Sequence, residues 1–509
     1  MTVREAMTEA EARFDRRRRA LGRVLAPALF VALWLAPLPG LSPSAHALAA
    51  VAAATVALWI TEAVPLPVAA LLGPALAVLT GVAPAKQAFA PLSDPLIYLF
   101  LGGFVLAEGL ARQGVDRRIA LWLIARPQVA GSPSRAMVAI GLIAWAFSMW
   151  ISNTATCAML LPVALGLHAT MREVIGDDPQ QRRALDHFGG GMCLLLAYAA
   201  SIGGVATPIG TGPNVIAIGM LEEQLGEHFG FTRWMAFALP LSAAMMATAT
   251  VLAVRRFRPP MTRLPGLADE VARQLRALGP VSVAERRAVA VFGVAVLGWL
   301  TPSLLQLALG GAHPWASWAG DVLDEGVVAI VCASALFVLP SGRSDPGRPH
   351  LLSWEDAQRL DWGTLLLLGG GLSLGKLTFD TGLAEAIGRG VLANVGGLAS
   401  HPFGLLTCAV VLMLVLTEVT SNTAVTSMML PVFLGVAQAA GLSPLPVAVL
   451  ATIAASFAFM LPVSTPPNAM AYGTRMIRIE SMLALGTRLD LAGLGWLLVL
   501  GATLLPLIM

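Results

Sequence analysis

The sequence predicts an all-α polytopic membrane protein, and three properties of the chain support this class. Its 509 residues are 57% hydrophobic and only 12% charged, whereas soluble domains carry roughly 25% charged residues. The mean hydropathy is +0.75, and apolar runs of helix-spanning length recur from Val24 almost to Met509. A chain in lipid must satisfy its own backbone hydrogen bonds. These runs lack the alternation of barrel strands, so we expect helices.

The N-terminal segment 1–23 is a polar, basic arm that shows no cleavable signal pattern. Because its arginine run, 16–19, adjoins the first apolar stretch, we interpret the arm as a cytoplasmic membrane anchor and expect no nucleic-acid partner. With the N-terminus inside, all but a few of the 33 lysines and arginines fall on the cytoplasmic side. The exceptions are Lys86, Arg233, Lys376 and Arg389. The positive-inside rule therefore predicts a multi-pass protein of the cell inner (plasma) membrane with a cytoplasmic N-terminus.

The apolar runs predict about 11 transmembrane helices. We place them near 24–40, 47–60, 62–81, 95–111, 187–221, 234–255, 288–309, 326–340, 363–378, 444–473 and 489–508. Two further stretches, 136–168 and 403–440, are long, and polar residues interrupt each of them, so they fit poorly as simple spans. The segment 257–287 is rich in Arg and Pro and is expected to be a short amphipathic connector in the cytoplasm.

The two interrupted stretches belong to an internal repeat. Ser152–Gly166 reads SNTATCAMLLPVALG and Ser421–Gly435 reads SNTAVTSMMLPVFLG, identical at ten of fifteen positions. Downstream, TGPN at 211–214 is echoed by TPPN at 465–468, and upstream, LGG at 101–103 is echoed by LGG at 368–370. Three landmarks in the same order indicate a duplicated unit.

The charge distribution gives the two copies opposite orientations. The span at 95–111 runs inward and ends in Arg112, whereas its counterpart at 363–378 starts just after Arg359 and runs outward. Inverted repeats are typical of transporters, with the binding site at the repeat interface near the middle of the membrane. The interrupted stretches then become two re-entrant helical hairpins, because irregular backbone at that depth must be buried or line a watery cavity.

Each Ser-Asn-Thr triplet supplies hydroxyl and amide oxygens at a hairpin tip. Pro213 and Pro467 break the following spans and leave carbonyl groups free to bind. Oxygen ligands without carboxylates suit a monovalent ion such as Na⁺. A single triplet is more often a helix N-cap than a set of ligands. Two copies, each paired with a broken span, favour a binding site, in which the cap role persists.

No lysine or arginine lies beside either triplet in the sequence. The charge of a bound anion would therefore have to be met by helix N-termini and by co-bound cations. This is a physical reason for an anion and Na⁺ to move together.

These motifs, together with WITEAVPLP at 59–67, resemble the divalent anion/sodium symporter family over nearly the whole chain. The resemblance implies import of C4-dicarboxylates such as succinate, malate and fumarate, coupled to Na⁺. It also implies a homodimer in the lipid bilayer, with scaffold and transport domains that move as an elevator. The implied division is 1–23 arm, 24–130 scaffold, 131–256 transport, 257–287 connector, 288–398 scaffold and 399–509 transport.

Carried over by motif, the resemblance implies two sodium sites and one substrate site. The sodium ligands are Ser148, Ser152, Asn153 and Gly210 in the first copy, and Thr417, Thr420, Asn422 and Ser464 in the second. The dicarboxylate would contact Asn153, Thr154, Thr211, Asn422, Thr423, Thr465 and Pro466. Gly212 departs from the double-proline form of the second copy, which leaves the shape of the first break open.

Several alternatives remain at this point. The same fold could serve a dicarboxylate exchanger, or a citrate- or sulfate-type Na⁺ symporter, and a channel or membrane enzyme is the rival of a different class. We expect no enzyme and no catalytic residue, because the GLSLG sequence at 371–375 lies in an apolar span without a nearby histidine. Glu62 and Glu108 are either functional or satisfied acids at span ends. Glu418 is either structural or able to tune sodium or proton coupling.

Overall fold

A computed structural model describes residues 9–175, 177–226, 229–262, 267–342, 349–395 and 401–504. Within these ranges the regular elements are helices, apart from an isolated antiparallel bridge between Pro340 and His350. The first-half helices are α1 (Glu9–Leu35), α2 (Pro43–Thr61), α3 (Leu66–Leu79), α4 (Ala85–Phe89), η2 (Ala90–Ser93), α5 (Pro95–Gln113), α6 (Val115–Ile124), α7 (Pro127–Ala130), α8 (Pro133–Ser148), α9 (Asn153–Ile175), α10 (Pro179–Gly204), α11 (Gly212–Leu225), α12 (Phe231–Arg256) and α13 (Leu267–Ala277). The second-half helices are α14 (Val283–Leu309), α15 (Pro314–Val322), α16 (Glu325–Val338), α17 (Trp354–Ala357), α18 (Trp362–Asp380), α19 (Leu383–Val395), α21 (Pro402–Thr417), α22 (Asn422–Ala439), α23 (Pro444–Ala455), α24 (Pro466–Gly473) and α25 (Ile479–Thr503).

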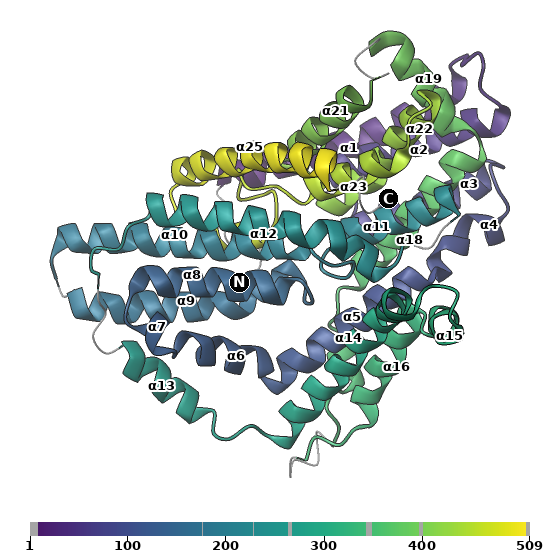
Figure 1. Ribbon diagram of the computed structural model, residues 1–509. Helices are drawn as coiled ribbons and strands as arrows, with labels where there is room; N and C mark the ends of the chain where they lie inside the picture. Colours follow the sequence, from purple (N-terminus) through teal and green to yellow (C-terminus); the bar gives the residue numbers. More distant parts are fainter. Residues whose placement is uncertain are drawn as a thin grey trace.

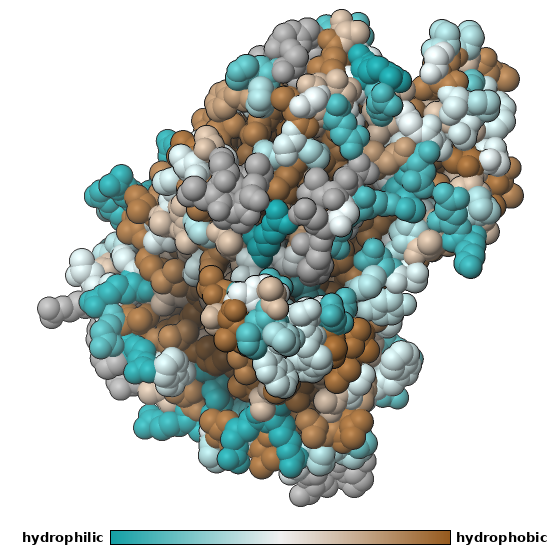
Figure 2. All heavy atoms as spheres, turned by 45° about the vertical axis from the view of Figure 1, so that its right-hand side comes forward, coloured by the Kyte–Doolittle hydropathy of each residue, from teal (hydrophilic) through white to brown (hydrophobic). Residues whose placement is uncertain are grey.

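Many of these helices suit a lipid environment. Among the described residues, 7 helical stretches are long and apolar enough to cross a membrane, and five shorter apolar helices accompany them. Large apolar side chains such as Leu79, Leu307 and Val338 stay more than 70% exposed, and Figure 2 shows broad hydrophobic areas on the face that it presents. Exposed apolar surface of this extent marks contact with a membrane or a partner. The chain is an all-helical membrane protein.

The first helix differs from the expected start of the first span at residue 24. Helix α1 already begins at Glu9, so the described part of the basic arm is helical. Arg18 pairs with Asp15 at 2.9 Å and with Glu62 at 3.1 Å. These ion pairs attach the basic turns of α1 to the end of α2 and give the arm a fixed position.

The two interrupted stretches are helix–turn–helix units. Helices α8 and α9 meet at residues 149–152, and α21 and α22 meet at residues 418–421. The spans that follow are also divided, since α10 ends at Gly204 and α11 begins at Gly212, while α23 ends at Ala455 and α24 begins at Pro466. The breaks fall at the repeated Pro-Asn elements, as the sequence predicts.

The two halves of the chain pack crosswise. Helix α5 packs on α16, and α18, which is its counterpart in the repeat, packs on α3. Both LGG motifs allow a close approach: a Cβ atom on Gly102 would lie 2.7 Å from the Ala329 carbonyl carbon, and one on Gly370 would lie 2.2 Å from the Ala70 carbonyl oxygen. Figure 1 shows α8, α9, α10 and α12 side by side, and α12 also contacts α14.

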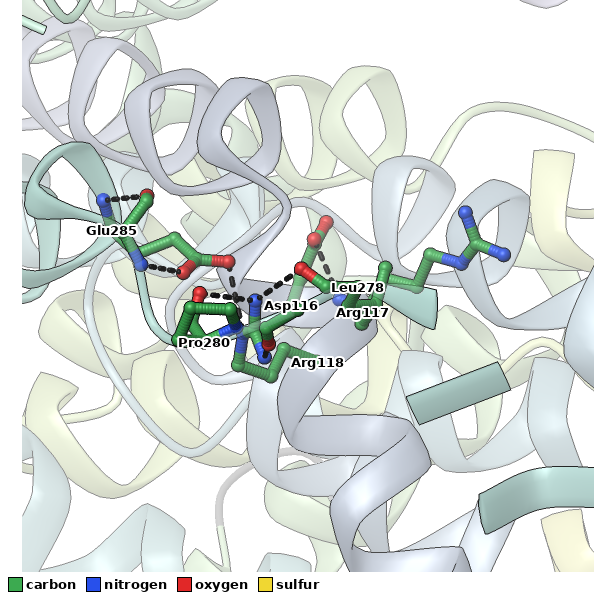
Figure 3. A network of polar contacts seen from close by, with 8 residues as sticks. Asp116, Arg117, Arg118, Leu278, Pro280 and Glu285 are labelled. Carbon is green, nitrogen blue, oxygen red and sulfur yellow. Dashed lines mark hydrogen bonds and ion pairs between the residues drawn. The ribbon is translucent and has the colours of Figure 1, made fainter. Parts of the chain in front are cut away.

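Two short helices, α6 and α13, run along one edge of the molecule and contact each other. Arg118 of α6 donates to the carbonyl oxygens of Leu278 at 3.2 Å and Gly279 at 2.8 Å, and to Glu285 Oε1 at 2.9 Å. Figure 3 shows this network, with the Arg117 side chain pointing away from it. A single guanidinium thus attaches α6 to the segment between α13 and α14.

Candidate functional site

The two hairpin tips line one cavity of about 690 Å³. All seven residues expected to contact the substrate line it: Asn153, Thr154, Thr211, Asn422, Thr423, Thr465 and Pro466. Of the expected sodium ligands that are not also in this set, Ser152, Gly210, Thr420 and Ser464 line the cavity, whereas Ser148 and Thr417 are fully buried behind the tips. The fold therefore brings together oxygen-bearing residues that are more than 250 positions apart in sequence.

At the first tip, α9 begins at Asn153. The Ser148 hydroxyl donates to Asn153 Oδ1 at 2.7 Å, and Ser152 Oγ accepts the Ala155 N–H at 3.3 Å. Asn153 Oδ1 lies 2.3 Å from the position of a Cβ on Gly204, so the amide reaches the end of α10. Ser152 therefore caps α9, which is the N-cap role expected for a single triplet. The Asn153 side chain still lines the cavity.

The second tip repeats this geometry. The Thr417 hydroxyl is placed to donate to Asn422 Oδ1 at 2.7 Å, and it also lies against the Ala455 carbonyl oxygen at the end of α23. Thr417 occupies the position of Ser148, and Asn422 that of Asn153, in the repeat. Ser421 makes no side-chain cap hydrogen bond. The hydroxyl–amide pair is therefore the feature that the two copies share.

Two further asparagines hold the broken spans, and the sequence reasoning did not assign them a role. Asn214 Nδ2 donates to the carbonyl oxygens of Gly204 at 3.0 Å and Thr207 at 2.8 Å, and Asn468 Nδ2 donates to those of Ala458 at 2.9 Å and Leu461 at 3.1 Å. Unwound carbonyls in a buried place need such donors. The sequence signal that could have identified them is the Pro-Asn pair, which occurs in both copies of the repeat.

These residues offer uncharged oxygens of the kind that a weakly held cation prefers. Within the described residues, the Oδ1 atoms of Asn214 and Asn468 and the hydroxyls of Ser201 and Ser456 are buried without a hydrogen-bond partner. The part of the chain that the structure describes contains no group of three or more His, Cys, Asp or Glu residues suited to a metal ion. The arrangement suits Na⁺ as a transported ion better than a resident divalent metal.

Charged residues line the cavity away from the tips, namely Glu62, Glu108, Arg359 and Asp361. Glu62 pairs with Arg18, and Glu108 pairs with Arg112 at 2.9 Å. Glu62 also ends α2 in a left-handed conformation, with φ of 46°. These partners favour the structural interpretation of both acids.

The fold and the site together define a class of protein. A helical, lipid-facing chain built from two copies of one unit, with a polar cavity between the copies, is a membrane transport protein. Residues 17–509 match the family described as the sodium:sulfate symporter transmembrane region. The chain belongs to this family, which confirms the resemblance found in the motifs and the expectation that the protein is a transporter and not an enzyme.

Individual relatives agree with this assignment. The chain is 32% identical over 468 residues to the sodium-dependent dicarboxylate transporter SdcS of Staphylococcus saprophyticus, covering 92% of this chain and 87% of that one. It is also 32% identical over 429 residues to SdcS of Staphylococcus aureus strain RF122, covering 84% and 80%.

Two solved structures share the fold at low sequence identity. They are the YdaH transporter of Alcanivorax borkumensis, with a TM-score of 0.55 and 16% identity, and MtrF of Neisseria gonorrhoeae, with a TM-score of 0.53 and 12% identity. These likenesses cover 96% and 95% of this chain, and 97% and 94% of the other two.

Proposed function

We propose that the protein imports C4-dicarboxylates of the succinate, malate and fumarate class by Na⁺ symport. The observation that carries the proposal is that both Asn-Thr pairs, 153–154 and 422–423, line one cavity. Their amides and hydroxyls can donate to the two carboxylates of a short dianion, and α9 and α22 begin at these residues, so that their positive N-terminal ends meet the anion.

The charge distribution of the cavity supports coupling to a cation. Among the described lining residues, Arg359 is the one basic side chain, and it belongs to a loop outside the tips. A dianion between the tips would therefore require co-bound cations, and the Ser148–Asn153 and Thr417–Asn422 pairs are where we place two Na⁺ ions. SdcS, which the chain resembles, is named a sodium-dependent dicarboxylate transporter, and this name supports the same substrate and ion.

The transport cycle is proposed to follow an elevator mechanism in a homodimer. Helices α11 and α22 of the proposed transport domain pack on α18 of the proposed scaffold. The cavity extends toward Glu62, Glu108 and Arg359, which the positive-inside rule places on the cytoplasmic side. We therefore assign this conformation as inward-facing, with the hairpins re-entrant and the N-terminus in the cytoplasm.

The deciding experiment is uptake of labelled succinate into proteoliposomes, with or without an inward Na⁺ gradient and with an unloaded or dicarboxylate-loaded lumen. Symport predicts Na⁺-dependent uptake into unloaded vesicles. Uptake only into loaded vesicles would establish exchange instead, and preference for labelled citrate or sulfate would reassign the substrate. Flux that does not saturate with substrate would indicate a channel.

A further inference from the structure

A groove lies between α6 and the segment that follows α13. Its volume is about 640 Å³, which falls in the range of pockets that bind small ligands. Among its lining residues are Ile119 and Trp122 of α6, Arg276 of α13 and Val281, which follows α13. The groove shares no described lining residue with the cavity between the hairpin tips, so it is a separate site.

Part of the groove surface is apolar and exposed. Ile119 and Trp122 are three positions apart and therefore neighbours on one side of α6, and Trp122 is 48% exposed. Val281, from the other segment, is 51% exposed. The buried residues Leu121 and Ile124 point to a different side of α6. Helix α6 thus has a second apolar side that stays exposed, and a surface of this kind marks contact with a membrane or a ligand.

Two guanidinium groups accompany this apolar surface. Arg276 lines the groove, and the guanidinium carbon of Arg126 lies 3.8 Å from the centre of the Trp122 ring. Within the described residues, neither arginine forms an ion pair with a carboxylate, whereas Arg118, which also lines the groove, pairs with Glu285. None of the described lining residues is acidic. The groove therefore carries a net positive charge that attracts an anion.

The place of α6 in the chain puts the groove next to the bilayer. Gly114 is the one residue between α6 and α5, which ends a stretch long and apolar enough to span a membrane. The positive-inside rule assigns both 112–135 and 255–287, which contain α6 and α13, to the cytoplasmic side. An exposed tryptophan beside arginines is typical of the membrane–water interface. The groove therefore lies at the level of the lipid headgroups.

We propose that this groove binds an anionic phospholipid of the cytoplasmic leaflet. Arg126 and Arg276 hold the phosphate group, and the acyl chains lie against Ile119, Trp122 and Val281. Guanidinium groups suit phosphate oxygens, and basic pockets on the cytoplasmic side of membrane proteins bind anionic headgroups. A free anion would leave the apolar side chains exposed to water, so the combination of charge and apolar surface favours a lipid.

The lipid lies at the chain connections between the proposed domains. Helix α6 leads from the proposed scaffold part, 24–130, toward the transport part that starts at residue 131, and α13 belongs to the connector 257–287. A lipid in the groove contacts both connections at once and stabilises their contact. This inference goes beyond the proposed function, because it does not depend on which anion or cation is transported.

The test uses the full-length protein in phosphatidylcholine vesicles that contain a small fraction of phosphatidylglycerol or phosphatidylcholine with brominated acyl chains, which quench nearby tryptophans. The Trp122 emission is the difference between each protein and its Trp122→Phe counterpart. Brominated phosphatidylglycerol should quench this emission roughly tenfold more effectively than brominated phosphatidylcholine, because two arginines attract its headgroup. The double variant Arg126→Gln, Arg276→Gln should lose this preference. Arg117→Gln, at an exposed position of α6 that does not line the groove, is the matched control and should keep it.

Several results would overturn the inference. Equal quenching by the two brominated lipids, or a preference that the double variant retains, would show that the groove binds no anionic lipid. Absence of quenching by either lipid would place Trp122 away from the bilayer. Loss of the preference on addition of inorganic phosphate at constant ionic strength would assign the groove to a free anion instead. Should the double variant not fold, as judged by size-exclusion chromatography, Arg276→Gln alone decides, since it should lower the preference.

Discussion

At the scale of single residues, the site consists of a small set of side chains used twice. A hydroxyl five positions before each asparagine donates to its amide oxygen, from Ser148 in one copy and from Thr417 in the other. The role of the triplets in a binding site could be predicted from sequence, because the same three polar residues recur in two apolar stretches, which is improbable by chance. The hydroxyl–amide pairs could not, because they depend on how tightly each tip turns.

The asparagines of the two triplets are the first residues to test. Replacement of Asn153 or Asn422 by alanine should lower succinate uptake at least tenfold, because each change removes one amide from both the substrate site and a sodium site. The measurement is initial uptake into proteoliposomes at equal protein content. Asn394→Ala, at an exposed position of α19, is the matched control and should transport normally. Wild-type rates in either triplet variant would refute the paired site.

Asp116 gives a pH-dependent prediction outside the membrane spans. Burial raises the pKa of this carboxyl from 3.8 to about 6. The folded state therefore binds this proton more tightly than the unfolded chain does, so the contribution of Asp116 to stability is greatest below pH 4 and falls by up to about 3 kcal/mol as the pH rises through 6. Asp116→Asn should remove this loss and raise the melting temperature at pH 7.5. If the melting temperature of Asp116→Asn changed between pH 4.5 and pH 7.5 by as much as that of wild type, the prediction would be contradicted.

At the scale of elements, the short helices α6 and α13 were not predicted as such. The basic segment 112–135 was expected only to lie on the cytoplasmic side, because α6 is too short and too charged to be recognised as a span. Its position depends on tertiary contacts of Arg118 with carbonyl groups that no local pattern reveals. The helices of the two hairpins and of the broken spans were easier to predict, because proline residues and the Ser-Asn-Thr triplets mark their ends.

Removal of the Arg118 side chain tests how α6 is held. Arg118→Ala leaves Glu285, which is 6% exposed, without its guanidinium partner. Glu285 keeps the Ser282 N–H as a donor, so we expect loss of the guanidinium to destabilise the protein by roughly 1–3 kcal/mol. We expect a lower melting temperature in detergent, partly restored in Arg118→Lys. Arg117→Ala, the exposed neighbour, should be neutral, and equal losses in the two alanine variants would show that the network contributes nothing.

At the scale of the whole molecule, one ion pair joins the proposed scaffold to the proposed transport domain. Lys376 of α18 contacts Glu223 of α11, and each side chain is 31% exposed. A sliding transport domain would have to break this pair. The family resemblance implied from sequence that the transport domain moves between two states, but the residues that hold the present state follow only from the packing.

Loss of the pair should favour the opposite conformation. In a Cys408→Ser background, a cysteine at Val463, which is 68% exposed in the cavity, should react with an impermeant maleimide supplied from the cytoplasmic side. We expect Lys376→Ala to slow this labelling several-fold. Arg389→Ala, which breaks an exposed pair within α19, should leave the labelling rate unchanged. Equal rates in both variants would show that Lys376 does not favour this state.

The hydroxyl–amide pairs have a consequence for the half of the cycle in which nothing is carried. A symporter must return across the membrane unloaded, and an amide oxygen stripped of both ion and water would make that step costly. In both tips a hydroxyl group already contacts the amide oxygen that a cation would take. We therefore expect the hydroxyls of Ser148 and Thr417 to serve both states. Each rotates so that its oxygen faces a bound Na⁺, and its hydrogen returns to the amide oxygen when the ion leaves, so the unloaded carrier crosses with its amide oxygens satisfied.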